Sequence, residues 1–169
     1  GLNFAHYPAS VAEVVAIEPE RDLRRHALRA ALRAEVPVDV VPGVAEALPV
    51  KSEAFDAAVV SLVLCSVRHV PRALAEIRRV LRPGGELRFF EHGQAWQGGA
   101  MVTVQRTLDA TVWPLLFGGC HVSRPTLPML RAAGFDLGPY RQLLLPKEGL
   151  RLPTSYFALG TAHRPDADG

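Results

Sequence analysis

Short apolar segments alternate with amphipathic ones along the first half of the chain, and this alternation most constrains the fold. Val11–Ile17 and Val38–Val41 indicate brief strands, while residues 20–35 carry apolar side chains at helical spacing among arginines. Phe55–Leu64 is almost wholly apolar, as expected of a strand buried on both faces of a parallel sheet. Strands joined by helices in this order are typical of a doubly wound α/β fold.

A strongly amphipathic helix is predicted next, over residues 70–81, because apolar side chains recur there every three or four residues. Pro83-Gly84-Gly85 is expected to end this helix sharply. Glu86–Glu91 then predicts another strand, so strand and helix continue to alternate.

The second half of the chain predicts two helices and two closing strands. Met101–Leu115 has helical spacing of apolar residues, and a second helix should begin at Ser123 as its N-cap and stop at Gly134. Tyr140–Leu145 and Tyr156–His163 indicate the closing strands, with a turn between them.

Length and composition indicate one globular domain, since the chain has 169 residues, of which 49% are apolar and 21% charged. We expect this domain to cover residues 1–164, with a tail at 165–169. The net charge of +2 is too small to favour nucleic acid as a partner. Four arginines would stack on one helix face, which we interpret as a solvated surface rather than an anion-binding one; they are Arg21, Arg25, Arg29 and Arg33.

The two cysteines, Cys65 and Cys120, stand in apolar stretches, which favours reduced thiols and a cytoplasmic location. The longest apolar run, Ala57–Val67, is too short to cross a bilayer core of about 30 Å, so no membrane segment is expected in this chain. No pattern of metal ligands is predicted, and nothing indicates an oligomeric state. Because the first residue is Gly1 rather than Met, we expect the natural protein to extend upstream.

Glu18 is the first candidate functional residue, an acid at the end of an apolar strand. In nucleoside-binding α/β folds such an acid accepts hydrogen bonds from both ribose hydroxyls. This placement suits adenosine, whichever cofactor carries it. The alternative is local, because Glu18-Pro19-Glu20 is also a favourable helix start.

Three later motifs resemble one family. Gly43-Val44-Ala45-Glu46-Ala47-Leu48-Pro49, then Phe55-Asp56, then Leu81-Arg82-Pro83-Gly84-Gly85 occur in the order found in small class I S-adenosylmethionine-dependent methyltransferases. The resemblance implies a Rossmann-like, mostly parallel sheet with a C-terminal antiparallel strand. It also implies that the first strand is missing, so that the domain is incomplete at its N-terminus and residues 1–169 alone would be unstable.

The same resemblance implies a set of residues for S-adenosylmethionine. Gly1 would be the last glycine of the cofactor loop, Ala45 would offer its amide to the adenine, and Ser61 would border the methionine part. Val44 departs from the family, in which many members have an acid at this position to bind the adenine amino group. The complete set of expected cofactor residues is Gly1, Asn3, Glu18, Pro19, Ala45, Glu46, Ser61 and Leu62.

A narrower resemblance covers Leu62–Val67, Phe90-Glu91-His92 and Trp113–Cys120, which are similar to the thiol methyltransferases. It implies methyl transfer to a small-molecule acceptor, with an alkyl thiol as one such acceptor. His92 and His69 are the candidate bases, although a capping or core histidine is the plainer interpretation of each. The acceptor pocket would be shaped by Trp113, Phe117, His121 and Arg124. Each cysteine is equally consistent with core or turn packing.

Two other functions stay open at this point. A nicotinamide-dependent oxidoreductase would also place an acid on a ribose, but it does not require the two later motifs. A non-catalytic remnant of a methyltransferase would explain the incomplete start. The leading hypothesis is an S-adenosylmethionine-dependent methyltransferase.

Overall fold

The computed structural model describes residues 1–166, and the chain divides into two compact units. The N-terminal unit is Gly1–Val50, and the C-terminal unit begins at Lys51. Residues 167–169 of the predicted tail lie outside the described residues.

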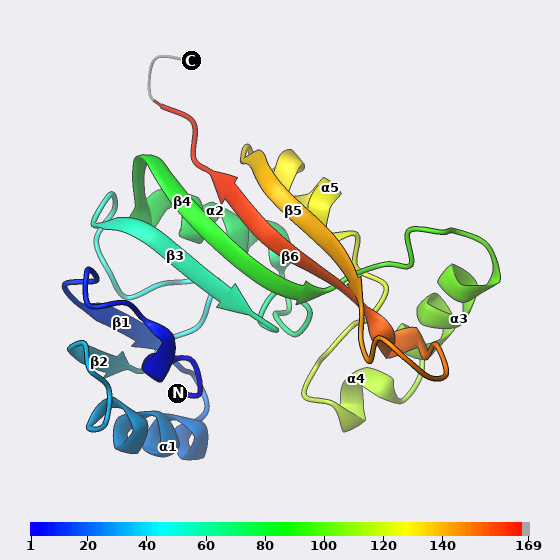
Figure 1. Cartoon of the computed structure of the whole chain (residues 1–169), viewed down its shortest axis with the longest axis horizontal. Helices are drawn as coiled ribbons and strands as arrows, with labels where there is room; N and C mark the ends of the chain where they lie inside the picture. The colour runs from blue at the N-terminus through cyan, green and yellow to red at the C-terminus, as the bar shows by residue number, and fades with distance from the viewer. Residues whose placement is uncertain (167–169) are drawn as a thin grey trace. The chain divides into compact units, whose positions relative to one another are not determined.

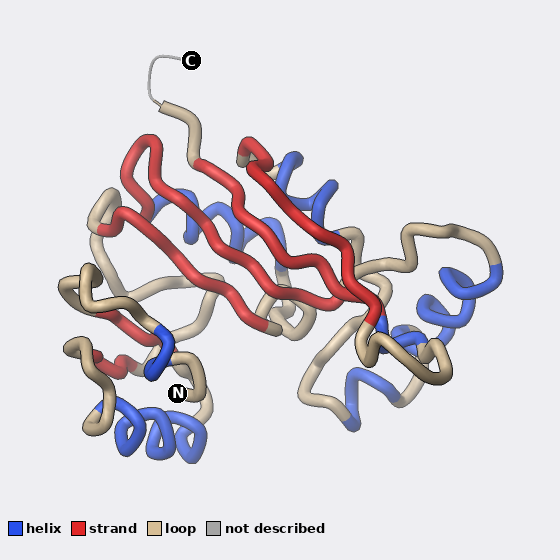
Figure 2. Tube along the Cα trace, viewed as in Figure 1, coloured by secondary structure: helices blue, strands red, loops and turns tan. Residues whose placement is uncertain are grey.

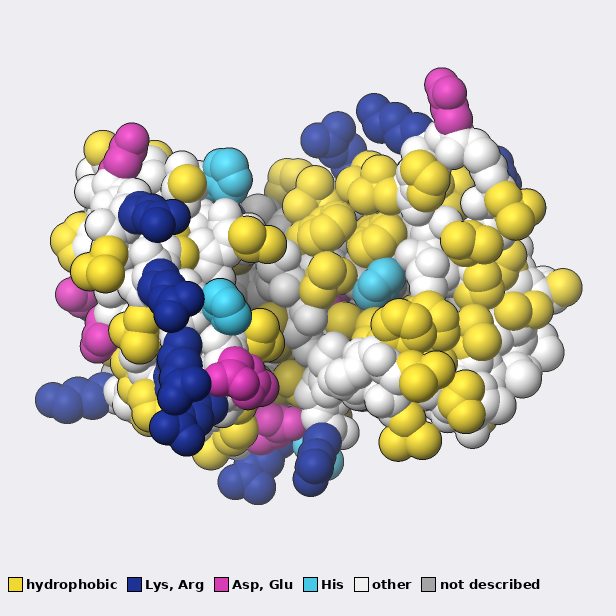
Figure 3. Space-filling view, turned by 90° about the horizontal axis from the view of Figure 1, so that it is seen from below, with side chains coloured by type: hydrophobic (Ala, Val, Ile, Leu, Met, Phe, Trp, Pro, Cys, Tyr) yellow, Lys and Arg dark blue, Asp and Glu magenta, His cyan; other side chains and the backbone are white. Residues whose placement is uncertain are grey.

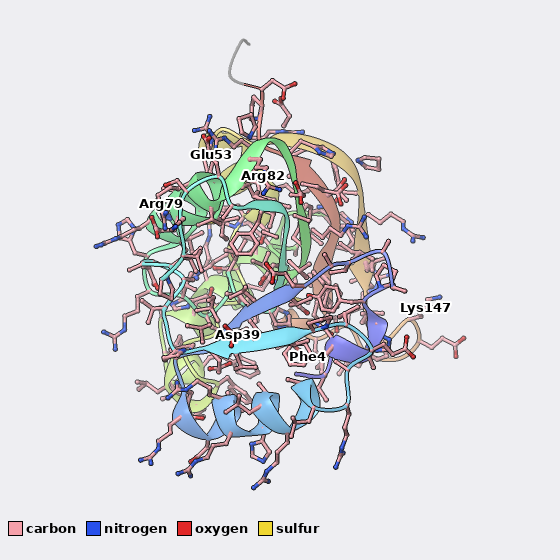
Figure 4. All side chains as sticks on the ribbon, turned by 90° about the vertical axis from the view of Figure 1, so that its left-hand side faces the viewer. Phe4, Asp39, Glu53, Arg79, Arg82 and Lys147 are labelled. Atoms are coloured by element: carbon pink, nitrogen blue, oxygen red, sulfur yellow. The ribbon has the colours of Figure 1, made fainter. Side chains whose placement is uncertain are left out.

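The N-terminal unit is a two-stranded parallel sheet covered by one helix (Figure 1). Strands β1 (Val14–Ile17) and β2 (Val38–Val41) are joined through helix α1 (Arg21–Ala31), and a short 3-10 helix, η1 (Phe4–His6), precedes them. The small core of this unit is formed by Phe4, Ala27 and Val40. Phe4 is labelled in Figure 4.

Helix α1 begins at its N-cap, Glu20, whose carboxylate accepts a 2.6 Å hydrogen bond from the amide of Leu23. The sequence predicts this helix to residue 35, but it ends at Ala31 because the following residues close into tighter turns before Pro37. Lys and Arg side chains form a dark blue column over α1 in Figure 3. The four predicted arginines are exposed there, in keeping with a solvated face.

The C-terminal unit has a four-stranded sheet in the order β3-β4-β6-β5 (Figure 1). Its strands are β3 (Phe55–Ser61), β4 (Leu81–His92), β5 (Asp136–Leu144) and β6 (Tyr156–His163). β3 and β4 are parallel, and β6 is antiparallel to both β4 and β5. Three strands therefore run in one direction with an antiparallel strand at the C-terminus, which confirms the predicted sheet.

Helices α2 (Val70–Val80) and α5 (Thr126–Ala132) lie on the same face of this sheet, while α3 (Ala100–Asp109) and α4 (Trp113–Leu116) lie beside one end of it (Figures 1 and 2). A second 3-10 helix, η2 (Pro153–Ser155), contacts α3. The core between sheet and helices is apolar and includes Leu74, Leu81, Leu87, Phe89 and Leu130. The amphipathic pattern of α2 is confirmed, because its predicted apolar positions are buried.

Helix α2 ends at Val80, before Pro83-Gly84-Gly85, as the sequence predicts, but these three residues form a bulge within β4 rather than a turn ahead of the strand. Leu81 already pairs with Phe55, and the regular register resumes only at Glu86. Gly84 has a φ of +73°, and its amide donates to the carbonyl of Arg164. Strand pairing with the C-terminal strand therefore extends β4 through the glycines.

The predicted strand 55–64 ends earlier, at Ser61, because Leu62 adopts a φ of +57° that no strand continues. The predicted helix 101–115 is divided into α3 and α4. The break falls after Asp109, where the side chain of Thr111 donates to the carbonyl of Leu108 at 2.9 Å. Pro114 then starts the new helix, where its missing amide is tolerated.

Ser123 does not cap α5, so this expectation was wrong. Its hydroxyl donates to Asp109 at 2.6 Å, and the helix begins at Thr126, after Pro125. The predicted stop at Gly134 is confirmed, because this glycine has a φ of +80°, which suits a helix end.

A polar cluster fixes the start of β3 against the end of α2 (Figure 4). The Arg79 guanidinium binds Glu76 and also donates to the Ser52 hydroxyl at 3.1 Å. Glu53 accepts from Arg164 at 2.8 Å. This cluster lies at the amino end of β3, so it anchors the strand at the end away from Ser61.

Candidate functional site

The carboxylate of Glu91 organises the segment that follows β3. It is fully buried near the end of β4 and accepts three backbone hydrogen bonds, from Val63 at 2.8 Å, Leu64 at 3.0 Å and Cys65 at 3.2 Å. Burial raises the pKa of Glu91, and the three amide donors oppose that rise. The segment 62–65 is thus held around one buried acid.

Ser61 and Leu62 stand where this segment leaves the sheet. Ser61 pairs with Phe90, and the amide of Leu62 donates to the Phe90 carbonyl at 2.8 Å. The left-handed backbone of Leu62 then turns the chain, and its side chain is 43% exposed. Ligands of open α/β sheets bind outside the carboxyl ends of the parallel strands. The exposed Leu62 side chain lies at such a strand end.

His92, the last residue of β4, is a half-buried imidazole beside the ring of Phe157, with centroids 4.5 Å apart. Its Nδ1 is buried and has no hydrogen-bond partner among residues 1–166. Burial lowers the pKa of His92, and the backbone of Tyr156 and the charge of Asp109 partly oppose this shift. A neutral ring nitrogen without a partner can accept a proton.

His69 has a different local role, since it is the N-cap of α2. Its Nδ1 accepts a hydrogen bond from the amide of Arg72 at 3.2 Å. The capping interpretation therefore accounts for His69, and His92 remains the better candidate base.

A cavity of about 170 Å³ opens beyond His92. Phe157 and Thr126 line it, and both contact His92, the first through its ring and the second by donating its hydroxyl to the His92 carbonyl at 2.9 Å. Its lining contains no charged side chain, and it consists of Gly93, Gln94, Ala95, Trp96, Pro125, Thr126, Leu127, Pro128, Gln142, Phe157 and Ala158. This composition suits a small uncharged ligand.

Gln105 anchors residues 93–96, the first of the segments that line this cavity. It is fully buried in α3, and its side chain accepts from the amide of Ala95 at 2.8 Å. Its Nε2 donates to the carbonyls of Gly93, Val122 and Pro153. One amide side chain thus joins three segments that are distant in the sequence.

Asp109, one helical turn after Gln105, holds the loop before α5. Its carboxylate accepts from the amides of Val122 and Ser123 at 2.8 and 2.9 Å. These bonds fix the loop that carries His121 and Arg124.

The four residues predicted for the acceptor pocket do not line the cavity. The rings of Trp113 and Phe117 stack on one another with centroids 3.9 Å apart. Arg124 donates to the carbonyl of Leu64, and its other nitrogen lies 3.1 Å from Nδ1 of His121. The structure therefore brings His121 and Arg124 to the segment after β3, next to Cys65.

In the N-terminal unit, the two acids around Pro19 have separate roles. Glu20 caps α1, whereas Glu18 follows β1 and accepts at Oε1 from the amide of Glu20 at 2.9 Å. Arg24 donates to the Glu18 carbonyl at 2.9 Å. Within residues 1–166, the start of the helix thus engages only one oxygen of the Glu18 carboxylate.

Ala45 and Glu46 form the corner of a tight turn closed by a bond from the Ala47 amide to the Val44 carbonyl. Gly43 is required before this turn, because a Cβ there would lie 2.8 Å from Pro49 and 2.9 Å from Ile17. The remaining predicted residues, Gly1, Asn3 and Pro19, are exposed in the same unit.

Sequence reasoning missed Gln105 and Asp109, and it used Glu91 only as part of a motif. A detectable signal existed for Glu91, an acid that directly follows the aromatic pair Phe89-Phe90 in a predicted strand. Gln105 lies between the apolar positions Met101 and Leu108 of the predicted helix, so a polar residue on the inward face was also visible.

The fold and these residues define a methyltransferase domain: residues 1–89 match the methyltransferase domain family, and the chain belongs to it. It is 33% identical over 139 residues to human thiol S-methyltransferase TMT1A, covering 80% of this chain and 56% of that protein. It is 42% identical over 82 residues to rat thiol S-methyltransferase TMT1B, covering 48% of this chain and 33% of that protein. The chain therefore spans about half or less of the length of these relatives.

A second group of relatives is named for C-methylation. The ubiquinone/menaquinone biosynthesis C-methyltransferase UbiE of Syntrophotalea carbinolica is 36% identical over 141 residues, which is 82% of this chain and 52% of that protein.

Among solved structures, the [4+2]-cyclase SpnF has a TM-score of 0.71 at 21% identity, over 98% of this chain and 70% of SpnF. A methyltransferase from Methanosarcina mazei has a TM-score of 0.65 at 19% identity, over 90% and 82% of the two chains. These structures confirm the fold.

Within residues 1–166, no helix has the length and apolar character needed to span a bilayer. No cluster of three or more His, Cys, Asp or Glu side chains that could hold a metal ion occurs in this part of the chain.

Proposed function

We propose that the protein transfers a methyl group from S-adenosylmethionine to a small uncharged acceptor. The match of residues 1–89 to the methyltransferase domain family carries this proposal. The geometry of Glu18 supports it, because a second acid caps the helix and leaves a carboxylate oxygen for ribose. The nicotinamide-dependent alternative is not favoured, since the family that matches is that of methyltransferases.

The residues present fit the cofactor. Glu18 would accept hydrogen bonds from the ribose hydroxyls, and the turn at Ala45 and Glu46 would border the adenine. Gly1, Asn3 and Pro19 belong to the same N-terminal unit. Ser61 and Leu62 would border the methionine part, for which the exposed Leu62 side chain offers an apolar surface. When bound, S-adenosylmethionine supplies a methyl group activated by its sulfonium.

The chain's own contribution is positioning and proton removal. The cavity beside Phe157 would hold the acceptor and exclude water, and orienting two reactants can contribute about 7–11 kcal/mol to lowering a barrier. His92 would accept the acceptor's proton at Nδ1, which is buried and unpaired among the described residues. Glu91 would fix the segment 62–65 at the same edge of the sheet.

A thiol is the acceptor class we propose. The relatives TMT1A and TMT1B are named as thiol S-methyltransferases, and the uncharged cavity suits an alkyl or aryl thiol. A thiol with a pKa near 8.5 already contains some thiolate at neutral pH, so a neutral histidine is a sufficient base.

The experiment compares two acceptor classes with the full-length protein and S-adenosylmethionine. An alkyl thiol and a substituted hydroquinone are supplied separately, and products are identified by mass spectrometry. We expect an S-methyl thioether from the thiol. A C-methylated hydroquinone instead, as the name of the UbiE relatives would suggest, would contradict the thiol proposal but keep methyl transfer. No product from either, by a protein that still binds the cofactor, would favour the non-catalytic remnant.

A further inference from the structure

Two loops of the C-terminal unit are held side by side. One follows β3 and the other follows α4. The amide of His121 donates to the carbonyl of Cys65 at 2.8 Å. A Cβ on Gly119 would lie 3.0 Å from the carbonyl oxygen of Ser66, so backbone approaches backbone closely here. Arg124 adds a third tie through the carbonyl of Leu64.

This arrangement brings together the only two cysteines of the chain, which are 55 positions apart in the sequence (120 − 65). The interaction between their thiols shifts the pKa of both, upward for Cys65 and downward for Cys120. The thiol of Cys65 also lies 3.5 Å from the hydroxyl of Ser66. Neither cysteine is in a disulfide.

The two thiols differ in exposure and acidity. Cys65 is 2% exposed, and its interaction with Cys120, together with burial, raises its pKa. Cys120 is only half-buried, and the interaction with Cys65 lowers its pKa. Cys120 is therefore the more exposed and the more acidic of the two thiols, and we expect a soluble reagent to meet it first.

We propose that Cys65 and Cys120 form a peroxide-reactive dithiol that closes reversibly to an intramolecular disulfide. In the first step the Cys120 thiolate attacks a peroxide oxygen, the O–O bond breaks, and Cys120 sulfenic acid and water form once the leaving hydroxide takes a proton. In the second step the sulfur of Cys65 displaces that hydroxyl, so that the S–S bond forms and a second water leaves. Two thiols are oxidised and one hydrogen peroxide is reduced to two waters.

This property is separate from methyl transfer, because it uses neither the cavity nor His92. It would nevertheless act on the segment 62–65, which Glu91 holds from the other side. A disulfide would tie that segment covalently to the loop before His121.

The test treats the reduced full-length protein with hydrogen peroxide, blocks remaining thiols with N-ethylmaleimide and digests with trypsin. Cleavage after Lys51, Arg68, Arg106 and Arg131 would place Cys65 in peptide 52–68 and Cys120 in peptide 107–131. We expect these two peptides joined, with a mass lower by two hydrogens than their sum, from protein that runs as a monomer on a non-reducing gel. Dithiothreitol should restore both thiols. Peptide mapping also separates this change from oxidation of Met101 and Met129.

Two variants, each first shown to have the wild-type circular dichroism spectrum, test the order of events. In Cys65→Ser, Cys120 should stop at the sulfenic acid and be trapped by dimedone. In Cys120→Ser, Cys65 should resist both peroxide and maleimide until the protein is unfolded. The proposal is overturned if the joined peptides do not form, if they form only between two molecules, or if Cys65 reacts readily in Cys120→Ser.

Discussion

Glu91 and Val63 lie 28 positions apart in the sequence, yet the carboxylate of the first accepts a 2.8 Å hydrogen bond from the amide of the second. With the bonds to Leu64 and Cys65, this contact makes one buried side chain the partner of three consecutive amides. Those amides would otherwise be without partners, and each such loss costs about 1–3 kcal/mol. The contact thereby joins the ends of β3 and β4 at the edge where the candidate site lies.

Glu91→Gln should lower the free energy of unfolding by about 2–4 kcal/mol, because the amide side chain keeps one acceptor oxygen and turns an NH₂ group toward the remaining amides. Urea unfolding of the full-length protein measures this change. The matched control is Glu86→Gln on the same strand, which removes only a partly exposed ion pair between Glu86 and Arg88. We expect less than about 1 kcal/mol for the control. Equal losses for both variants would mean that the three amide bonds contribute little.

His92→Gln should reduce kcat by about a hundredfold or more if His92 is the proton acceptor. His69→Ala should leave kcat unchanged, because that ring caps α2. The second variant should lower stability by about 0.5–2 kcal/mol, as loss of a cap usually does. Initial rates with a thiol acceptor measure the first effect and thermal unfolding the second. A large fall in kcat for His69→Ala but not for His92→Gln would mean that His69, and not His92, is the proton acceptor.

The pH dependence of stability should also reveal His92. Burial lowers its pKa in the folded state, so below the ordinary value near 6.5 the unfolded chain binds a proton that the folded chain does not. The free energy of unfolding should therefore fall as pH decreases from about 6.5 toward the lowered pKa of His92. In His92→Gln this part of the decrease should disappear, as urea titrations across that range would show. The same slope in both proteins would argue against a lowered pKa.

Gln105→Met keeps the shape of the side chain but removes its four hydrogen bonds. It should cost about 2–4 kcal/mol, since the Ala95 amide and three carbonyls lose a buried partner. Gln97→Met is the control, because that side chain makes one long, exposed contact with Arg151 at 3.5 Å. Differential scanning calorimetry of both variants would show the difference. A control that is destabilised as much as Gln105→Met would contradict the anchoring role.

The sequence predicted most of the sheet and helix α2, because alternation and amphipathic spacing are local properties of the chain. It did not predict the bulge at Gly84, whose amide donates to the carbonyl of Arg164, the residue after the last strand. Ser123 failed as a cap for a similar reason: Asp109 offers its hydroxyl a stronger, charged acceptor from another helix. Contacts between distant segments decided both cases.

The candidate site divides in the same way. Glu18, Ser61, Leu62 and His92 could be proposed from motifs, because each lies at or just after the carboxyl end of a strand that is evident in the sequence. Gln105 and the pairing of Cys65 with Cys120 depend on how α3, α4 and the following loop fold back, which no short pattern specifies. Polar residues at inward positions of apolar elements were the visible trace of these contacts.

Calorimetric titration of the full-length protein with S-adenosylmethionine tests the central claim most directly, when wild type, Glu18→Gln and Glu20→Gln are compared. The account predicts saturable binding to wild type and binding about tenfold to a hundredfold weaker for Glu18→Gln, because a charged acceptor for the ribose is lost. Glu20→Gln should bind as wild type does, since it alters only the cap of α1. No binding to a folded wild-type protein, or equal affinity in all three, would contradict the account.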